Sequence, residues 1–191
     1  MTYLSPAKIN LFLHVTSKRS DGYHNLQTIF QLVDYCDEIN INYRSDGVID
    51  RISGNEHIPK NQDLIIRSAT LLKKITGSKG GADIAIVKKI PIGGGLGGGS
   101  SNAATVLNAL NKLWNLNLPK EELVDIGQNL GADVPVFING HSSWGEGIGE
   151  ILTPISLPKY FYLIVTIGKH ISTKEIFTHK ALTMSPVQRK I

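Results

Sequence analysis

The most informative part of the chain reads Lys89-Ile90-Pro91-Ile92-Gly93-Gly94-Gly95-Leu96-Gly97-Gly98-Gly99-Ser100-Ser101-Asn102-Ala103-Ala104. Six of its residues are glycines within seven consecutive positions, a density that suits backbone at positive φ or close to a ligand. Alternating isoleucines from Ile84 to Ile90 predict a strand before it, and helical spacing after it predicts a helix with Ser100 or Ser101 as N-cap. A glycine loop between a strand and a helix N-terminus favours phosphate binding, because unpaired N–H groups and the positive end of the helix dipole meet there.

Three other interpretations of this loop are disfavoured. An ordinary P-loop ends in Gly-Lys-Ser/Thr, whereas Ser100 follows Gly99 directly. The dinucleotide fingerprint is matched by Gly93-x-Gly95-x-x-Gly98, but any polyglycine run matches it, and the loop follows several strands rather than opening a repeating βαβ series. A flexible linker is not usually bounded by an apolar strand and an Ala-rich helix.

The first third of the chain is predicted to be a β-meander. A strand from Ala7 to Val15 projects Lys8 and Asn10 from one face, about 7 Å apart, and apolar residues from the other. After a turn near Gly22, two separate strands are expected, from Leu26 to Val33 and from Asp37 to Tyr43. The second is expected to turn three side chains inward: Ile39, Ile41 and Tyr43.

Helices are predicted on both sides of the glycine loop. The first runs from Asn61 to Ile75, with Asp63 as N-cap and Gly77 past its end. Another begins at Pro119 and ends at Gly131. Further along, the chain predicts a hairpin (142–146 with 150–152), a strand (160–167) and a weak helix (174–182).

Composition limits the class of protein. With 191 residues and 41% hydrophobic content, the chain can bury a core and holds one domain, or one domain and part of another. The net charge of +4 is spread over scattered basic residues, which favours small anionic substrates over nucleic acid. The only cysteine, Cys36, excludes an intrachain disulfide and fits a reducing compartment. The longest apolar stretch is too short to span a membrane, so we expect a cytoplasmic protein.

Four motifs occur in a characteristic order. Pro6-Ala7-Lys8-Ile9-Asn10-Leu11 and Asp21-Gly22-Tyr23-His24 precede the glycine loop, and Gly131-Ala132-Asp133-Val134-Pro135 follows it. Together they resemble the GHMP kinases over nearly the whole chain. The resemblance implies an α+β fold, a mixed sheet with packed helices, in which residues 1–155 form the N-terminal ATP-binding domain. Residues 156–191 would begin an incomplete C-terminal domain.

The resemblance also implies a role for individual residues. Lys8 and Asp133 would be catalytic, with Asp133 as the base, and Asn10 would orient the acceptor. Tyr23, His24 and Phe30 would hold the cytosine of a substrate. The residues expected around the phosphates of ATP are Pro91, Ile92, Gly93, Gly94, Gly95, Leu96, Gly97, Gly98, Gly99, Ser100 and Ser101.

ATP and Mg²⁺ are the cofactors that the resemblance implies, with the metal ligands left open. The family pattern usually has Asn where this chain has Asp63, so we assign Asp63 to capping and not to recognition of adenine. The oligomeric state is also open.

Two hypotheses of function follow. The first is an ATP-dependent kinase that phosphorylates the 2-hydroxyl of a cytidine diphosphate sugar alcohol in non-mevalonate isoprenoid biosynthesis. The alternative is a catalytically incomplete nucleotide-binding fragment, because the family carries a third glycine-rich motif that these 191 residues lack.

Overall fold

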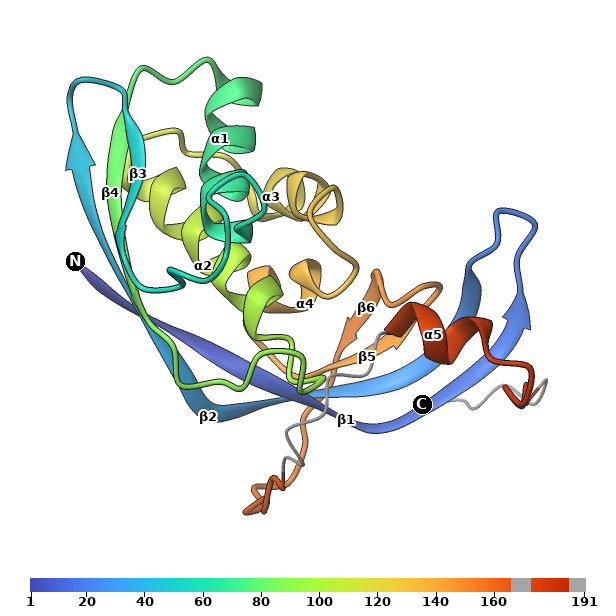
Figure 1. Ribbon diagram of the computed structural model, residues 1–191. Coiled ribbons are helices and arrows are strands. Elements are labelled where there is room, and N and C mark those ends of the chain that lie inside the picture. Colours follow the sequence, from blue (N-terminus) through green and yellow to red (C-terminus); the bar gives the residue numbers. More distant parts are fainter. Residues whose placement is uncertain (166–172, 186–191) are drawn as a thin grey trace.

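The computed structural model describes residues 1–165 and 173–185, in which four helices cover one face of a mixed sheet (Figure 1). The strands are β1 (Thr2–Lys18), β2 (His24–Arg44), β3 (Ile49–Ser53), β4 (Gly81–Val87), β5 (Ser143–Glu146) and β6 (Ile151–Pro154). The covering helices are α1 (Leu64–Thr76), α2 (Gly98–Leu113), α3 (Lys120–Gln128) and α4 (Val134–Asn139). A fifth helix, α5 (Thr173–Thr178), lies apart from them, near the far end of the β1–β2 hairpin (Figure 1).

The long strand β2 connects the whole sheet. It pairs antiparallel with β1 along nearly all of its 21 residues, with β5 through residues 28–30 and with β4 through residues 38–44. The prediction of two separate strands was therefore wrong. The register shifts between the Pro6–Cys36 and Ala7–Val33 pairs, so the chain bulges around residues 34 and 35 instead of turning, and a bulge bends a strand without ending it.

Strand β4 joins β3 in parallel and ends earlier than the isoleucine pattern predicts. Its buried side chains alternate, with Ala82, Ile84 and Ile86 facing the helices. The strand stops at Val87 because the next amides are used elsewhere: Lys89 N and Ile90 N both donate to the carboxylate of Asp37. The carboxylate of Asp37 thus takes the place of the backbone acceptors of a neighbouring strand.

Helix α1 confirms its sequence signals. The side chain of Asp63 accepts a hydrogen bond from Ile65 N at 3.0 Å, and Gly77 ends the helix at φ 67°. Its buried positions follow helical spacing and form one face of the core: Ile65, Ser68, Ala69 and Leu72.

Helix α2 begins two residues or more before the expected cap. Gly97 occupies the N-cap position, so Ser100 and Ser101 lie inside the first turn and the prediction of a serine cap was wrong. The hydroxyl of Ser101 is fully buried and accepts a hydrogen bond from Ser5 Oγ at 2.8 Å. A serine whose hydroxyl meets another strand is not available to cap its own helix.

The remaining elements agree with the sequence in part. The β5–β6 hairpin is confirmed, and α3 follows Pro119 but ends at Gln128. No strand forms over 160–165, where Phe161 and Leu163 are almost fully exposed, and residues 166 and 167 lie outside the described ranges. Helix α5 is shorter than the predicted helix over 174–182. Tyr43 is 56% exposed rather than inward, because it lies at the end of β2.

Candidate active site

The glycine loop is seated on strand β1. Its tip residue Leu96 is buried with Ala7 and Ile90 in a small apolar cluster, and the carbonyl of Leu96 accepts a hydrogen bond from Lys8 N at 3.0 Å. The loop and the residue expected to be catalytic are therefore bonded to each other through the backbone.

Gly97 occupies a position that no other residue fits well. Its φ is +70°, and a Cβ there would lie 2.8 Å from Cζ of Phe137 and 3.2 Å from Cε of Lys8. The first bond of α2 runs from Ser101 N to Gly97 O at 2.8 Å. The amides of residues 98–100 precede that bond, so the helix does not use them, and they remain available to an anion at the helix N-terminus.

Lys8 and Asp133 come together beside the loop, although 125 positions separate them in the sequence. The ammonium of Lys8 donates to Asn10 Oδ1 at 2.7 Å and lies 3.4 Å from Asp133 Oδ2. It also lies 5.6 Å from the centre of the Phe30 ring. The side chain of Lys8 is 8% exposed and that of Asp133 is 35% exposed, so a buried cation holds a carboxylate that solvent can reach.

Asp133 is positioned by α4 without capping it. It stands at the N-cap position of this short helix, whose next five residues are all buried, yet its side chain makes no capping hydrogen bond. The side chain of Asp133 therefore does not serve as the cap of this helix. Its carboxylate instead pairs with Lys8 and lines the cleft.

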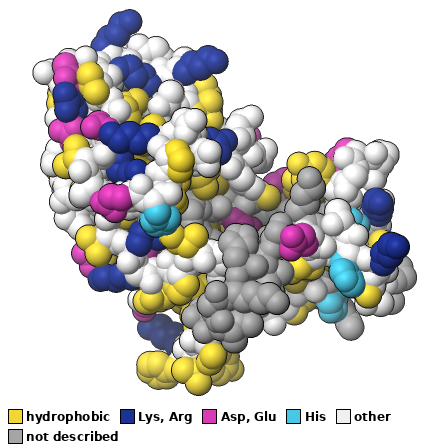
Figure 2. Space-filling model, in the orientation of Figure 1, with side chains coloured by type: hydrophobic (Ala, Val, Ile, Leu, Met, Phe, Trp, Pro, Cys, Tyr) yellow, Lys and Arg dark blue, Asp and Glu magenta, His cyan; other side chains and the backbone are white. Residues whose placement is uncertain are grey.

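A cleft of about 1800 Å³ runs from the glycine loop to the tip of the β1–β2 hairpin and to α5. In Figure 2 a hollow separates the helical layer from the α5 side of the molecule. All but one of the expected site residues line the cleft. The exception is Ser101, which is buried beneath it. Phe30 is only 3% exposed, so it forms part of the cleft floor.

The far end of the cleft carries two aromatic rings face to face. His24 stacks on Phe177 of α5, with ring centres 5.5 Å apart and an interplanar angle of 24°. Ser185 N donates to Val15 O at 2.8 Å, which fastens the segment after α5 to β1. The sequence analysis missed Phe177, because a single aromatic residue in a weakly predicted helix carries no local signal.

The turn before His24 is stabilised by charge. The guanidinium of Arg19 and then the amide of Tyr23 donate to Asp21, and together they lower the pKa of this carboxyl below its ordinary value. The carboxylate of Asp21 holds the backbone of Tyr23 by accepting its amide hydrogen bond at 3.0 Å. The Tyr23 side chain is 61% exposed at the edge of the cleft.

Asn55 is a second residue that the sequence analysis missed. It is 7% exposed and lines the cleft near Asp63, and its Oδ1 is buried without a hydrogen-bond partner. Asp63 itself forms a buried ion pair with Arg51. An unpaired buried acceptor is costly, so Asn55 is suited to receive a donor from a ligand.

No group of three His, Cys, Asp or Glu side chains that could hold a metal ion occurs among the described residues. Magnesium usually needs only one or two protein oxygens beside the phosphates of a nucleotide. The hydroxyl of Ser100 and the carboxylate of Asp133 both line the cleft and fit that requirement.

The described helices include none that is long and apolar enough to cross a membrane.

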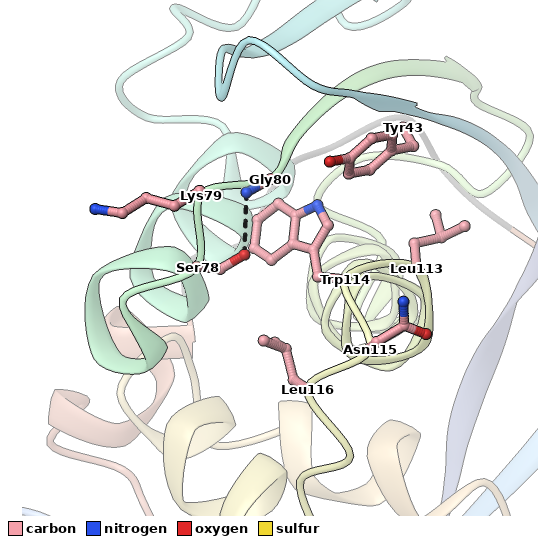
Figure 3. Close-up of a pocket in the computed structure, with 8 residues that line it drawn as sticks. All are labelled: Tyr43, Ser78, Lys79, Gly80, Leu113, Trp114, Asn115 and Leu116. Carbon is pink, nitrogen blue, oxygen red and sulfur yellow. Dashed lines mark hydrogen bonds between the residues drawn. The ribbon is translucent and has the colours of Figure 1, made fainter.

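A smaller cavity of about 530 Å³ lies at the other end of α2, away from the glycine loop (Figure 3). The indole of Trp114 packs against Gly80, where a Cβ would lie 2.6 Å from Trp114 Cδ1, and its Nε1 donates to Gly81 O at 3.2 Å. None of the expected site residues lines this cavity. We interpret the contacts as structural, because they join the end of α2 to the start of β4.

The chain is similar to known proteins along most of its length. Residues 63–141 match the family described as GHMP kinases N terminal domain. The chain is 62% identical over 190 residues to the 4-diphosphocytidyl-2-C-methyl-D-erythritol kinase of Ruthia magnifica, and 60% identical to that of Vesicomyosocius okutanii. Each match covers 100% of this chain and 67% of the relative, so the chain spans about two thirds of their length.

Solved structures give the same assignment. A crystal structure of 4-(cytidine 5'-diphospho)-2C-methyl-D-erythritol kinase is 40% identical with a TM-score of 0.72, over 83% of this chain and 56% of that one. The Methanococcus jannaschii mevalonate kinase, at 17% identity and a TM-score of 0.60 over 82% of this chain and 56% of that one, shares the fold. The chain therefore belongs to the 4-diphosphocytidyl-2-C-methyl-D-erythritol kinase family, within the GHMP kinases.

Proposed function

We propose that the chain transfers the γ-phosphoryl group of ATP to the 2-hydroxyl of 4-diphosphocytidyl-2-C-methyl-D-erythritol. The observation that carries the proposal is the Lys8–Asp133 pair, 3.4 Å apart beside the glycine loop. Because Lys8 N is bonded to Leu96 O, the pair and the loop keep a fixed relationship. Phosphoryl transfer depends mainly on such alignment and on neutralising charge, and needs little covalent help from the protein.

The glycine loop and the first turn of α2 are the proposed phosphate site. The unpaired amides of residues 98–100 would donate to phosphate oxygens, and Gly97 lets the backbone approach them closely. When bound, Mg²⁺ would neutralise phosphate charge. The hydroxyl of Ser100 and the carboxylate of Asp133 are the protein oxygens that would hold it. Asn55 would accept a hydrogen bond from the nucleotide base.

Asp133 is the proposed general base. Its partly exposed carboxylate would take the proton of the 2-hydroxyl as the hydroxyl oxygen attacks the γ-phosphorus, and ADP would leave. The buried ammonium of Lys8 would hold Asp133 in place and attract the charge that spreads over the phosphoryl oxygens. Asn10 would orient the acceptor, since its amide is already fixed by Lys8 and by Thr28 Oγ1.

The aromatic end of the cleft is the proposed cytosine site. His24 and Phe177 offer flat faces on which a base can stack, and Tyr23 stands at the same edge. Phe30 is proposed to support Lys8 from below rather than to contact the base, because it is almost fully buried.

The test is conversion of ATP to ADP by the 191-residue chain with 4-diphosphocytidyl-2-C-methyl-D-erythritol and Mg²⁺. Turnover that requires the acceptor would support the kinase. Binding of a non-hydrolysable ATP analogue without turnover would instead support the alternative, a nucleotide-binding unit that needs further sequence for catalysis. Absence of both binding and turnover would refute the proposal. We propose the cytoplasm as the compartment, because the single cysteine, Cys36, fits reducing conditions.

A further inference from the structure

A buried carboxylate lies beneath the glycine loop, outside the cleft. Asp37 of β2 is 0% exposed, and its Oδ1 accepts hydrogen bonds from Lys89 N at 2.7 Å and Ile90 N at 2.9 Å. Its Oδ2 accepts from Asn102 Nδ2 at 2.9 Å and forms an ion pair with the ammonium of Lys88. Four donors thus converge on one side chain for which the proposed reaction has no use.

The four donors come from both ends of the glycine loop. Lys88, Lys89 and Ile90 precede the glycines, whereas Asn102 lies after them, near the start of α2. The two ends also touch: a Cβ at Gly98 would lie 3.0 Å from Ile90 Cγ2 and 3.2 Å from Lys88 Nζ. One carboxylate therefore holds the loop closed at its base.

The network continues into strand β1. Asn102 Nδ2 also donates to Ser5 Oγ at 2.9 Å, and Ser5 Oγ donates to Ser101 Oγ at 2.8 Å. These three side chains are at most 2% exposed. Since Ser5 lies three residues before Lys8, the same strand carries both the anchor of the loop and the proposed catalytic cation.

A buried polar network of this kind specifies geometry more than it adds stability. Removing a carboxylate from water carries a large desolvation cost, which apolar packing in the same space would not incur. Fully satisfied networks, however, hold their members in one arrangement. Glycine loses more backbone entropy on ordering than other residues do. An anchor at the base of a loop with six glycines therefore restricts its conformation strongly.

We infer that Asp37 is a positioning residue that holds the glycine loop in the shape that receives the phosphates of the nucleotide. The inference rests on the proposed function of the loop, and it concerns a residue that does not touch the ligand. Through Lys89, Ile90 and Asn102, Asp37 fixes the two ends between which the amides of residues 98–100 are displayed.

If Asp37 acted only through its charge, its removal would change the affinity for an anion in the opposite direction. Asp37 is a negative charge beneath a phosphate site, so its removal alone would raise the local positive potential and tighten the binding of an anion. Loss of the anchor would weaken the binding. The variant Asp37→Asn separates the two, because it keeps the size of the side chain while removing the charge and part of the acceptor capacity.

The experiment measures the Kd of a non-hydrolysable ATP analogue and of cytidine diphosphate by calorimetry on the 191-residue chain. Asp37→Asn should raise the Kd of the ATP analogue by about tenfold or more. The Kd of cytidine diphosphate should stay within about twofold of its value in the unaltered chain. The double variant Lys88→Met with Asp37→Asn has the net charge of the unaltered chain and should show the same loss. Leu123→Ala in α3, a buried position remote from the loop, is the control for lowered stability and should change neither Kd.

Hydrogen exchange of the free chain gives a second readout. Asp37→Asn should speed exchange of the amides of Lys89 and Ile90 and of the first turn of α2, at least about tenfold, without the same change in α3. Unchanged loop exchange, tighter ATP-analogue binding, or equal loss of both ligands would overturn the inference. Failure of the unaltered chain to bind the ATP analogue would refute the proposed function instead, while exchange would still decide whether Asp37 holds the loop.

Discussion

The backbone amide of Lys8 donates to the carbonyl of Leu96 at 3.0 Å, so the strand that carries the proposed catalytic ammonium is bonded to the tip of the glycine loop. The side chain and the main chain of Lys8 thus serve different partners. The side chain meets Asn10 and Asp133, and the main chain holds the loop. Substitutions that alter only the side chain can therefore separate catalysis from nucleotide binding.

We expect Asp133→Asn to lower turnover by about 10²- to 10⁴-fold, because the amide keeps the size of the carboxylate but cannot act as a base. Stability should change by less than about 1 kcal/mol, since the Asp133 side chain is partly exposed and Lys8 keeps its hydrogen bond to Asn10. ATP-to-ADP conversion and a urea melt measure the two effects. Asp125→Asn, an exposed carboxylate on α3, is the matched control. Near-normal turnover in Asp133→Asn would remove the base assignment.

Lys8→Met should reduce turnover more than it weakens ATP binding. Methionine retains the backbone amide that bonds to Leu96 and much of the buried volume, but it loses the charge that faces Asp133. Steady-state rates compared with the Kd of an ATP analogue give the measurement. A Kd that rises in proportion to the loss of rate would contradict the separation of the two roles.

Gly97→Ala should lower the free energy of unfolding by about 2–4 kcal/mol and weaken the ATP analogue. The positive φ contributes about 1–2 kcal/mol and the contact with Phe137 contributes the rest. Gly140→Ala is the control, because Gly140 has φ +77° but no atom within 4 Å of its Cβ position. Urea denaturation should show a smaller loss for Gly140→Ala, and its ATP-analogue Kd should not change. If both variants lost the same free energy of unfolding, the contact with Phe137 would not contribute.

Phe177→Ala should weaken cytidine diphosphate by about 2- to 12-fold, which corresponds to the 0.5–1.5 kcal/mol of an aromatic stacking contact. The ring stacks on His24 at the end of the cleft that lies away from the glycine loop, so binding of the ATP analogue should be unaffected. Calorimetry with each ligand provides the test. Phe161→Ala, a fully exposed ring outside the cleft, serves as the control and should alter neither Kd. An unchanged cytidine diphosphate Kd in Phe177→Ala would place the base elsewhere.

Asp63→Asn should destabilise the fold by about 3–5 kcal/mol. The asparagine can still cap α1, but Arg51 is left as a buried cation without its carboxylate. The double variant Arg51→Met with Asp63→Asn should recover part of this loss in urea denaturation, because no uncompensated charge remains. If the single and double variants were equally destabilised, the ion pair would not be the cause.

Elements with strong local signals could be predicted from the chain alone. Helix α1 has a capping aspartate, apolar residues at helical spacing and a terminal glycine, all within one segment. The β5–β6 hairpin is marked by its glycine-rich turn in the same way. These signals succeed because the interactions that decide such elements lie within a few residues of each other.

Other features depended on distant partners. The unity of β2 follows from its pairing with β1 on one side and with β4 and β5 on the other, and the end of β4 follows from the capture of two amides by Asp37. In the sequence, Ser101 has the position and residue type of a helix cap, but its hydroxyl is bonded to Ser5 of β1. No local window contains both members of these pairs.

The candidate site divides along the same line. The glycine run by itself indicates a loop with backbone at positive φ or close to a ligand, because such glycine density lowers the stability of a regular helix or strand. That Lys8 meets Asp133, that Phe177 stacks on His24, and that Asp37 holds both ends of the loop were decided by the tertiary structure. Each of these contacts joins residues at least 50 positions apart, and only packing of the sheet against its helices and of α5 beside the hairpin brings such residues within bonding distance.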